Sequence, residues 1–493
     1  MKRTDGVLMH VSSLWGEYSC GSFGKAAKEF IDFLADCGFG AWQVLPFGIP
    51  DDFNSPYKAF SAFAGNPYFI DLDILGEKGL LTGAELAAAR QKTPYVAEFS
   101  RLGKERFPLL SVAAHRAYAD PALAERIDDT IGADPDLLDF CKFMARRAVN
   151  DGKPWYEWTK DGFDDETFRV WKFIQYEFFA EWDGIHRYAA KKGVSVIGDI
   201  PIYMDYDSAD VWAHPEEYQL DERKRPTAVA GVPPDYFAPM GQLWGNPLYR
   251  WDVMEKTDFR FWRARIAAML RLFDGVRIDH FRAAESYWSV PAGAETAREG
   301  KWVKGPGMAF VRAIRETVDE AKEASGQEKF IIAEDLGDID DAVRELVKES
   351  GFPGMRVLQF AFDSDATSPH LPHNYPARCV AYTGTHDNNT LLGFLFELSP
   401  EKRQKLLRYC GFDVCSGGDW NRPEVYDGII RMMLASHADT VILPIQDLLH
   451  YGSDTRMNTP GRAAGNWEFR LTGGQLSAVN REVFREWAEL YGR

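Results

Sequence analysis

Eight short apolar segments are spread along the chain, and each is bounded by Gly, Pro or Asp residues. Several are almost continuously hydrophobic, as in Phe330-Ile331-Ile332-Ala333. Continuous apolar runs are typical of parallel strands covered on both faces, because alternation is expected only where one face meets water. The pattern therefore predicts eight strands, in residues 6–14, 41–47, 194–200, 275–281, 330–336, 355–361, 379–385 and 440–449.

Helical spacing fills the intervals between these segments. Apolar residues recur three and four positions apart from Phe23 to Cys37 and stop at Gly38, and similar runs stop at Gly326 and Gly351. Strands that alternate with helices favour an α/β fold with a parallel sheet. Eight such units predict one (β/α)8 TIM barrel that occupies residues 1–493 and carries inserted subdomains in its βα loops.

Two intervals are too long for a simple βα unit. Residues 49–192 begin with an aromatic loop and continue as charged helical sequence, which predicts a mostly helical inserted subdomain. Residues 206–249 are rich in proline and glycine and show neither helical nor strand periodicity. Long ordered loops are commonly lids or binding loops, so we expect an irregular lid over the site.

Charge and cysteine content narrow the possible partners and location. The chain has 57 Lys and Arg against 74 Asp and Glu, a net charge of −17, which opposes nucleic acid or an anionic membrane as the main partner. No apolar run approaches the ~18 residues of a membrane span. Six cysteines without CxxC spacing indicate reduced thiols and a cytoplasmic location. The oligomeric state stays open.

Ionisable residues gather where four of the predicted strands end. In a barrel of this kind the active site is built at the C-terminal ends of the strands. Clustered carboxylates repel one another and cost several kcal/mol to bury unless they are paired, so stability alone explains them poorly. The residues concerned are Asp199, Arg277, Asp279, His280, Glu334, His386 and Asp387.

Each of these residues taken alone also has a purely structural interpretation. A single Asp after a strand is often a helix N-cap or a loop hydrogen-bonder, and a single His is often structural. The joint pattern favours a site, because Arg277 and Asp279 share one strand face and the guanidinium can keep that carboxylate ionised. One ionised and one protonated carboxyl group form the apparatus for cleaving a glycosidic bond.

Aromatic residues in the two long loops suit a sugar ligand. Flat aromatic faces beside amides can stack on pyranose rings while the amides bind hydroxyl groups, although aromatic residues more often belong to the core. The aromatic residues of interest are Tyr57, Phe60, Phe63 and Tyr68 in the first loop, and Tyr236, Phe237, Trp244 and Tyr249 in the second.

Seven segments of the chain form a recognisable set: Ser55-Pro56-Tyr57, Gly198-Asp199-Ile200-Pro201-Ile202-Tyr203, Gly231-Val232-Pro233-Pro234-Asp235-Tyr236-Phe237, Trp244-Gly245-Asn246-Pro247, Arg277-Ile278-Asp279-His280-Phe281-Arg282, Ala333-Glu334-Asp335-Leu336 and Thr385-His386-Asp387-Asn388. In these segments the chain resembles the 4-α-glucanotransferases (amylomaltases or disproportionating enzymes), glycoside hydrolase family 77 of the α-amylase clan. The resemblance runs in family order from Gly6 to about Asn466.

The resemblance implies a retaining transfer of α-1,4-glucan segments between donor and acceptor glucans, without a cofactor or metal. It implies Asp279 as nucleophile, Glu334 as general acid/base and Asp387 as transition-state stabiliser. The substrate-binding residues that it implies are Tyr57, Asp199, Tyr236, Trp244, Arg277, His280 and His386.

Three other functions fit parts of the pattern. An α-amylase-like hydrolase shares the catalytic trio and differs only in using water as acceptor. A metal-dependent barrel isomerase or lyase could use the same carboxylates and His386 as ligands, although Arg277 beside Asp279 already supplies a cation there. A non-catalytic glycan-binding protein has no need of the acidic trio.

Overall fold

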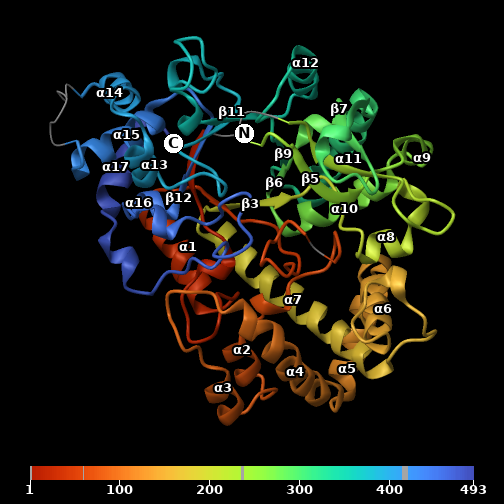
Figure 1. Cartoon of the computed structure of the whole chain (residues 1–493). Coiled ribbons are helices and arrows are strands. Elements are labelled where there is room, and N and C mark those ends of the chain that lie inside the picture. Colours follow the sequence, from red (N-terminus) through yellow and green to blue (C-terminus); the bar gives the residue numbers. More distant parts are fainter. Residues whose placement is uncertain (1–2, 59, 235–237, 413–419) are drawn as a thin grey trace.

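A computed structural model of the chain describes residues 3–58, 60–234, 238–412 and 420–493 (Figure 1). Eight parallel strands close into a barrel in the order β1-β12-β11-β10-β9-β6-β3-β2. Each strand overlaps one predicted segment, so the (β/α)8 prediction is confirmed. The barrel strands are β1 (Thr4–Leu8), β2 (Ala41–Gln43), β3 (Ser195–Ile200), β6 (Gly275–Ile278), β9 (Phe330–Ala333), β10 (Gly354–Val357), β11 (Cys379–Tyr382) and β12 (Thr440–Pro444).

The barrel closes where β1 pairs with β12 on one side and with β2 on the other. Gly6 lies opposite Ala41 in the β1–β2 ladder. A Cβ atom at Gly6 would lie 2.4 Å from the Ala41 carbonyl oxygen and 2.6 Å from its Cβ. The two strands can approach this closely only because residue 6 has no side chain.

Helices follow the strands and end where the sequence predicted. Gly38, Gly326 and Gly351 all take left-handed φ values, of 86°, 65° and 69°, directly after a helix. This is the conformation in which glycine ends a helix without a Cβ clash. The described helices outside the two insertions are α1 (Lys25–Cys37), α9 (Trp251–Lys256), α10 (Arg260–Leu272), α11 (Gly307–Ser325), α12 (Asp341–Ser350), α13 (Leu391–Glu397), α14 (Pro400–Tyr409), α15 (Pro423–Ala435), α16 (Ile445–Leu448) and α17 (Arg481–Tyr491).

Residues 49–192 contain a helical lobe on one side of the barrel, drawn in orange to yellow in Figure 1. Its longest helix, α7, packs against α4, α5 and α6 and then leads into β3. None of the described helices combines the length and apolar character needed to cross a bilayer. The helices of this lobe are α2 (Leu72–Glu77), α3 (Gly83–Ala89), α4 (Phe99–Tyr118), α5 (Pro121–Gly132), α6 (Pro135–Val149) and α7 (Asp165–Lys191).

The expectation that residues 206–249 form an irregular loop was wrong. This segment contains α8 (Ala209–Ala213), β4 (Ala228–Val232) and β5 (Gln242–Pro247). It forms an antiparallel sheet, in the order β5-β4-β7-β8, with β7 (Ser286–Pro291) and β8 (Lys301–Lys304) from the loop after β6. The strands are short, and the central pairing, between β4 and β7, joins two separate βα loops, so no local periodicity marks the sheet.

We expect Gly6→Ala to destabilise the barrel because the new methyl group would overlap the β2 backbone. Overpacking of this kind costs about 1–3 kcal/mol, occasionally more. The measurement is the free energy of unfolding from urea titration, or the fall in Tm. Gly83→Ala is the matched control, because Gly83 starts helix α3 and a Cβ there would meet nothing within 4 Å. Equal stability of the two variants would contradict this account of barrel closure.

Candidate active site

The ends of β3, β6, β9 and β11 bring the predicted carboxylates to one end of the barrel. Asp199 and Arg277 lie opposite each other in the paired strands β3 and β6, and Asp279 and Glu334 directly follow β6 and β9. An open groove of about 1070 Å³ lies here, bounded by residues from five barrel loops and from β5. Its lining includes Tyr57, Tyr203, Trp244, Asp279, His386, Asp387, Asn458 and Trp467.

Arg277 is the buried cation at the centre of the site. Its Nη1 donates to both oxygens of Asp199 at 2.8 Å, and its Nη2 donates to Asp279 Oδ1 at 2.7 Å. Burial opposes the charge on Arg277, but the two carboxylates raise the pKa of Arg277 well above its ordinary value. These contacts oppose the cost of burying the three groups, although burial still raises the pKa of Asp199. The Asp279 side chain is 30% exposed.

Glu334 is buried beside this cluster in a less polar environment. Burial, and then the nearby charge of Asp279, raise the pKa of Glu334 to about 7. Its Oε2 accepts from the His280 N–H and its Oε1 from the Leu336 N–H, each at 2.7 Å. His280, whose N–H binds Glu334, has the left-handed φ of 47°, a rare conformation for a residue with a side chain. Burial therefore leaves Glu334 able to carry a proton near neutral pH.

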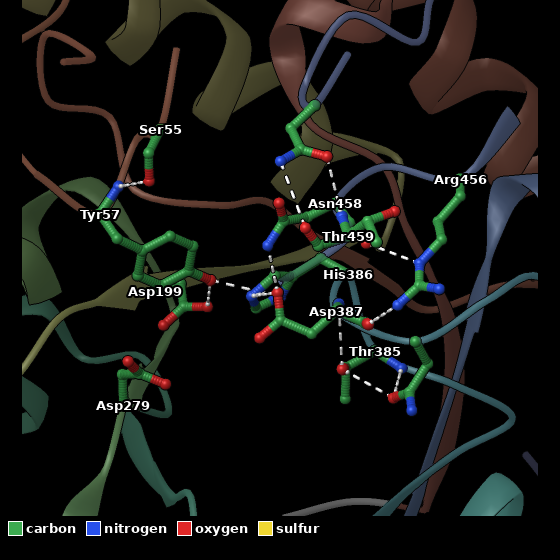
Figure 2. Close-up of polar contacts among 12 residues, drawn as sticks. Ser55, Tyr57, Asp199, Asp279, Thr385, His386, Asp387, Arg456, Asn458 and Thr459 are labelled. Carbon is green, nitrogen blue, oxygen red and sulfur yellow. Dashed lines mark hydrogen bonds and ion pairs between the residues drawn. The ribbon is translucent and has the colours of Figure 1, made fainter. Parts of the chain in front are cut away.

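Tyr57 and His386 form the wall opposite Asp279. The Tyr57 hydroxyl donates to Asp199 Oδ2 at 2.8 Å and lies 3.3 Å from His386 Nδ1. The two rings stack with their centroids 4.9 Å apart, and Trp467 packs against both. Figure 2 shows Tyr57 and Asp199 in contact, with Asp279 facing them. The wall joins the loop after β2 to the loop after β11.

Asp387 projects from the loop after β11 and is held by the segment after β12. Its Oδ1 accepts from Asn458 Nδ2 at 2.6 Å and lies 3.4 Å from His386 Nε2. Arg456 donates from its guanidinium to the Asp387 carbonyl (Figure 2). The Asp387 side chain stays 48% exposed, so these contacts fix its direction while leaving it open to the groove. The sequence reasoning missed both Arg456 and Asn458.

A third missed residue, Asp447, fixes the base of the same loop. It lies in α16, directly after β12, and is fully buried. Its Oδ2 accepts from the Thr383 hydroxyl at 2.6 Å and its Oδ1 from the Leu391 N–H at 2.8 Å. Burial raises the pKa of Asp447 to about 6. Both ends of the loop that carries His386 and Asp387 are therefore tied to one buried carboxyl group.

The remaining predicted residues lie on the β6 and β5 side of the groove. Trp244 of β5 lines the groove, and its ring meets the His280 ring edge to face at 5.0 Å. Tyr236 lies outside the described residues, as does Phe237. In the described part of the chain, no group of three or more His, Cys, Asp and Glu side chains is arranged to hold a metal ion. Asp199 and Asp279 instead share the Arg277 guanidinium.

Comparison with known proteins identifies the family. A family profile described as 4-alpha-glucanotransferase matches residues 9–477. The 4-alpha-glucanotransferase of Clostridium butyricum is 41% identical over 98% of this chain and 100% of its own, and that of Thermus thermophilus is 41% identical over 99% of each. An amylomaltase from Streptococcus agalactiae, solved in complex with acarbose, has a TM-score of 0.92 at 34% identity over the whole of both chains.

A second amylomaltase shows how far the fold persists as the sequence diverges. The enzyme from Corynebacterium glutamicum shares 18% identity with this chain, which covers 74% of its length, and the TM-score is 0.78. The barrel architecture is thus shared even at low identity. On the family profile and the relatives at 41% identity, the chain belongs to the 4-alpha-glucanotransferase family and is an enzyme of that class.

Proposed function

We propose that this enzyme transfers α-1,4-linked glucan segments by a retaining double displacement in which Asp279 is the nucleophile, Glu334 the general acid/base and Asp387 the transition-state stabiliser. The observation that carries the proposal is the contrast between two neighbouring carboxyl groups. Asp279 is bound by Arg277, whereas Glu334 is buried with a pKa of about 7. The acarbose complex of the Streptococcus agalactiae relative supports a sugar ligand in the groove.

In the first step, Asp279 attacks the anomeric carbon of the donor. The glycosidic C–O bond breaks, and Glu334 gives its proton to the leaving oxygen, so the shortened glucan departs with a free hydroxyl group. A covalent ester between the sugar and Asp279 remains, with inverted configuration. Positive charge develops on the sugar ring in the transition state, and the exposed carboxylate of Asp387 stabilises it.

In the second step, the ionised Glu334 takes the proton from an acceptor hydroxyl group, which attacks the same anomeric carbon. The ester bond breaks, Asp279 regains its charge, and the α configuration is restored. Arg277 can bind the free Asp279 carboxylate before the first step and again after the second. Tyr57, Asp199 and His386 would hold the hydroxyl groups of the donor sugar.

The acceptor is another glucan rather than water if the site excludes water and presents a sugar hydroxyl group to Glu334. Trp244 lines the groove next to His280, which places an aromatic face beside the residue that binds Glu334. We propose that Trp244, with His280 and Tyr236, binds the acceptor, and that the segment 206–249 serves as a lid there.

Maltotriose tests the reaction. We expect the enzyme to convert maltotriose to glucose and longer malto-oligosaccharides. Chromatography of samples taken over time measures these products. Asp279→Asn should abolish this redistribution, because it removes the nucleophile with little change in volume. Substantial turnover by a contamination-free preparation of that variant would refute the role of Asp279. A rise in reducing ends without longer products would show a hydrolase.

The pKa of Glu334 predicts the pH dependence. Burial raises this pKa to about 7, so the protonated acid that the first step needs is lost as the pH rises through that value. We expect kcat/KM on maltotriose to fall by about tenfold per pH unit above it. A maltosyl fluoride donor is the control, because fluoride leaves without a proton. The alkaline fall should disappear with that donor; a fall of the same size with both donors would contradict the assignment.

Trp244→Ala tests the choice of acceptor. We expect this variant to weaken transfer to added glucose or maltose more than hydrolysis, because it removes the aromatic face for the acceptor. Released reducing ends and transfer products are measured in the same reaction. Trp302→Ala is the matched control, since Trp302 is a 40% exposed tryptophan on β8 of the same sheet. An unchanged ratio for Trp244→Ala would show that this ring does not favour sugar over water.

A further inference from the structure

Two tyrosine rings form a stacked pair on the surface beside the groove. Tyr156 and Tyr206 lie almost parallel, with an interplanar angle of 5° and ring centroids 4.3 Å apart. Tyr156 belongs to a short 3-10 turn of the helical lobe, Trp155–Glu157, and Tyr206 to the loop after β3. Tyr156 is 46% exposed. Because Tyr206 covers one face of the Tyr156 ring, the exposed surface belongs to the other face and the edge.

Hydrogen bonds and ring packing hold the Tyr156–Tyr206 pair in place. The Tyr206 hydroxyl donates to the Lys224 carbonyl at 2.6 Å. Trp155 packs edge-on against Tyr206 and donates from its indole N–H to the Tyr206 carbonyl at 2.6 Å. The Trp155 N–H donates to Asp207, which also forms an ion pair with Arg147. Little conformational freedom remains to be lost at this aromatic surface when a ligand binds.

The pair continues the wall of the groove toward the helical lobe. Lys58 and Tyr203 line the groove, and Tyr206 follows three residues after Tyr203. The Lys58 ammonium lies 3.9 Å from the carboxylate of Asp205, the residue next to Tyr206, and both side chains are partly exposed. A hydrogen-bond donor and an acceptor therefore lie between the groove and the stacked rings.

We propose that the Tyr156–Tyr206 pair is a distal glucan-binding platform, on which a glucose unit of a long α-1,4-glucan stacks while the reacting part of the same chain lies in the groove. The apolar face of a pyranose ring packs on an aromatic face. Lys58 and Asp205 offer a donor and an acceptor to the glucose units between the platform and the groove. This proposal rests on the proposed function for the identity of the glucan. A chain too short to extend beyond the groove would not reach the platform.

Affinity for a long glucan tests the platform without requiring turnover. Electrophoresis in gels that contain soluble amylose gives the dissociation constant, and we expect Tyr156→Ala to raise it about three- to tenfold. Tyr156→Phe keeps the ring and should keep most of the affinity. Tyr95→Ala is the matched control, because Tyr95 is a 65% exposed tyrosine elsewhere in the helical lobe. Only Tyr156→Ala should also lower the ratio of kcat/KM on amylose to kcat/KM on maltotriose.

The outcomes separate this proposal from the proposed function. One outcome is that the unaltered enzyme disproportionates maltotriose while the Tyr156→Ala variant binds amylose as tightly as the unaltered enzyme. In that case the platform proposal is wrong and the proposed function stands. If the unaltered enzyme fails to disproportionate maltotriose, the proposed function is wrong. The gel mobilities of Tyr156→Ala and Tyr156→Phe then still show whether the platform binds amylose. A pair that only packs the lobe onto the barrel would lower Tm in Tyr156→Ala without changing amylose affinity. That result, or a protein that amylose does not retard, would overturn the proposal.

Discussion

The buried guanidinium of Arg277 is the interaction on which the rest of the site depends. Burying one cation and one carboxylate in a barrel is expensive unless their geometry is good. Here the strand register supplies that geometry, because Asp199 and Arg277 lie opposite each other on β3 and β6 and form a two-oxygen contact at 2.8 Å. Arg277 still has a second nitrogen to bind Asp279. The strand register thus positions the guanidinium that binds Asp279.

The same arrangement places Asp279 and Glu334, the two carboxyl groups of the proposed reaction, in different environments. Asp279 has the guanidinium as a neighbour and is partly open to the groove, whereas Glu334 lies deeper and is bound mainly by backbone N–H groups. The desolvation of Glu334 outweighs those hydrogen bonds, and the negative charge of Asp279 acts in the same direction. Changing Asp279 therefore also changes the electrostatic environment of Glu334.

The barrel and its acidic residues could be predicted because their signals are local. Buried parallel strands read as continuous apolar runs, and Asp279, Glu334 and Asp387 follow such runs closely. The sheet β5-β4-β7-β8 was missed because its pairing joins two separate βα loops, and a short segment such as Ala228–Val232 has no periodicity of its own. Asn458, Arg456 and Asp447 were missed for a related reason. Their contacts are with residues about 60 to 70 positions earlier, and nothing in their own surroundings marks them.

The missed residues explain how an exposed carboxylate can be held in a defined direction. Asp387 is half exposed and projects from a loop, so its side chain would lose entropy on binding if it were free in solution. Asp447 ties both ends of that loop to the barrel, and Asn458 and Arg456 bind Asp387 itself from the segment after β12. The segment after the last strand of the barrel thus contributes no group to the proposed chemistry, yet it supplies the contacts that orient one. Because β12 lies between β11 and β1 in the closed barrel, the segment that follows β12 begins beside the loop after β11, where Asp387 lies.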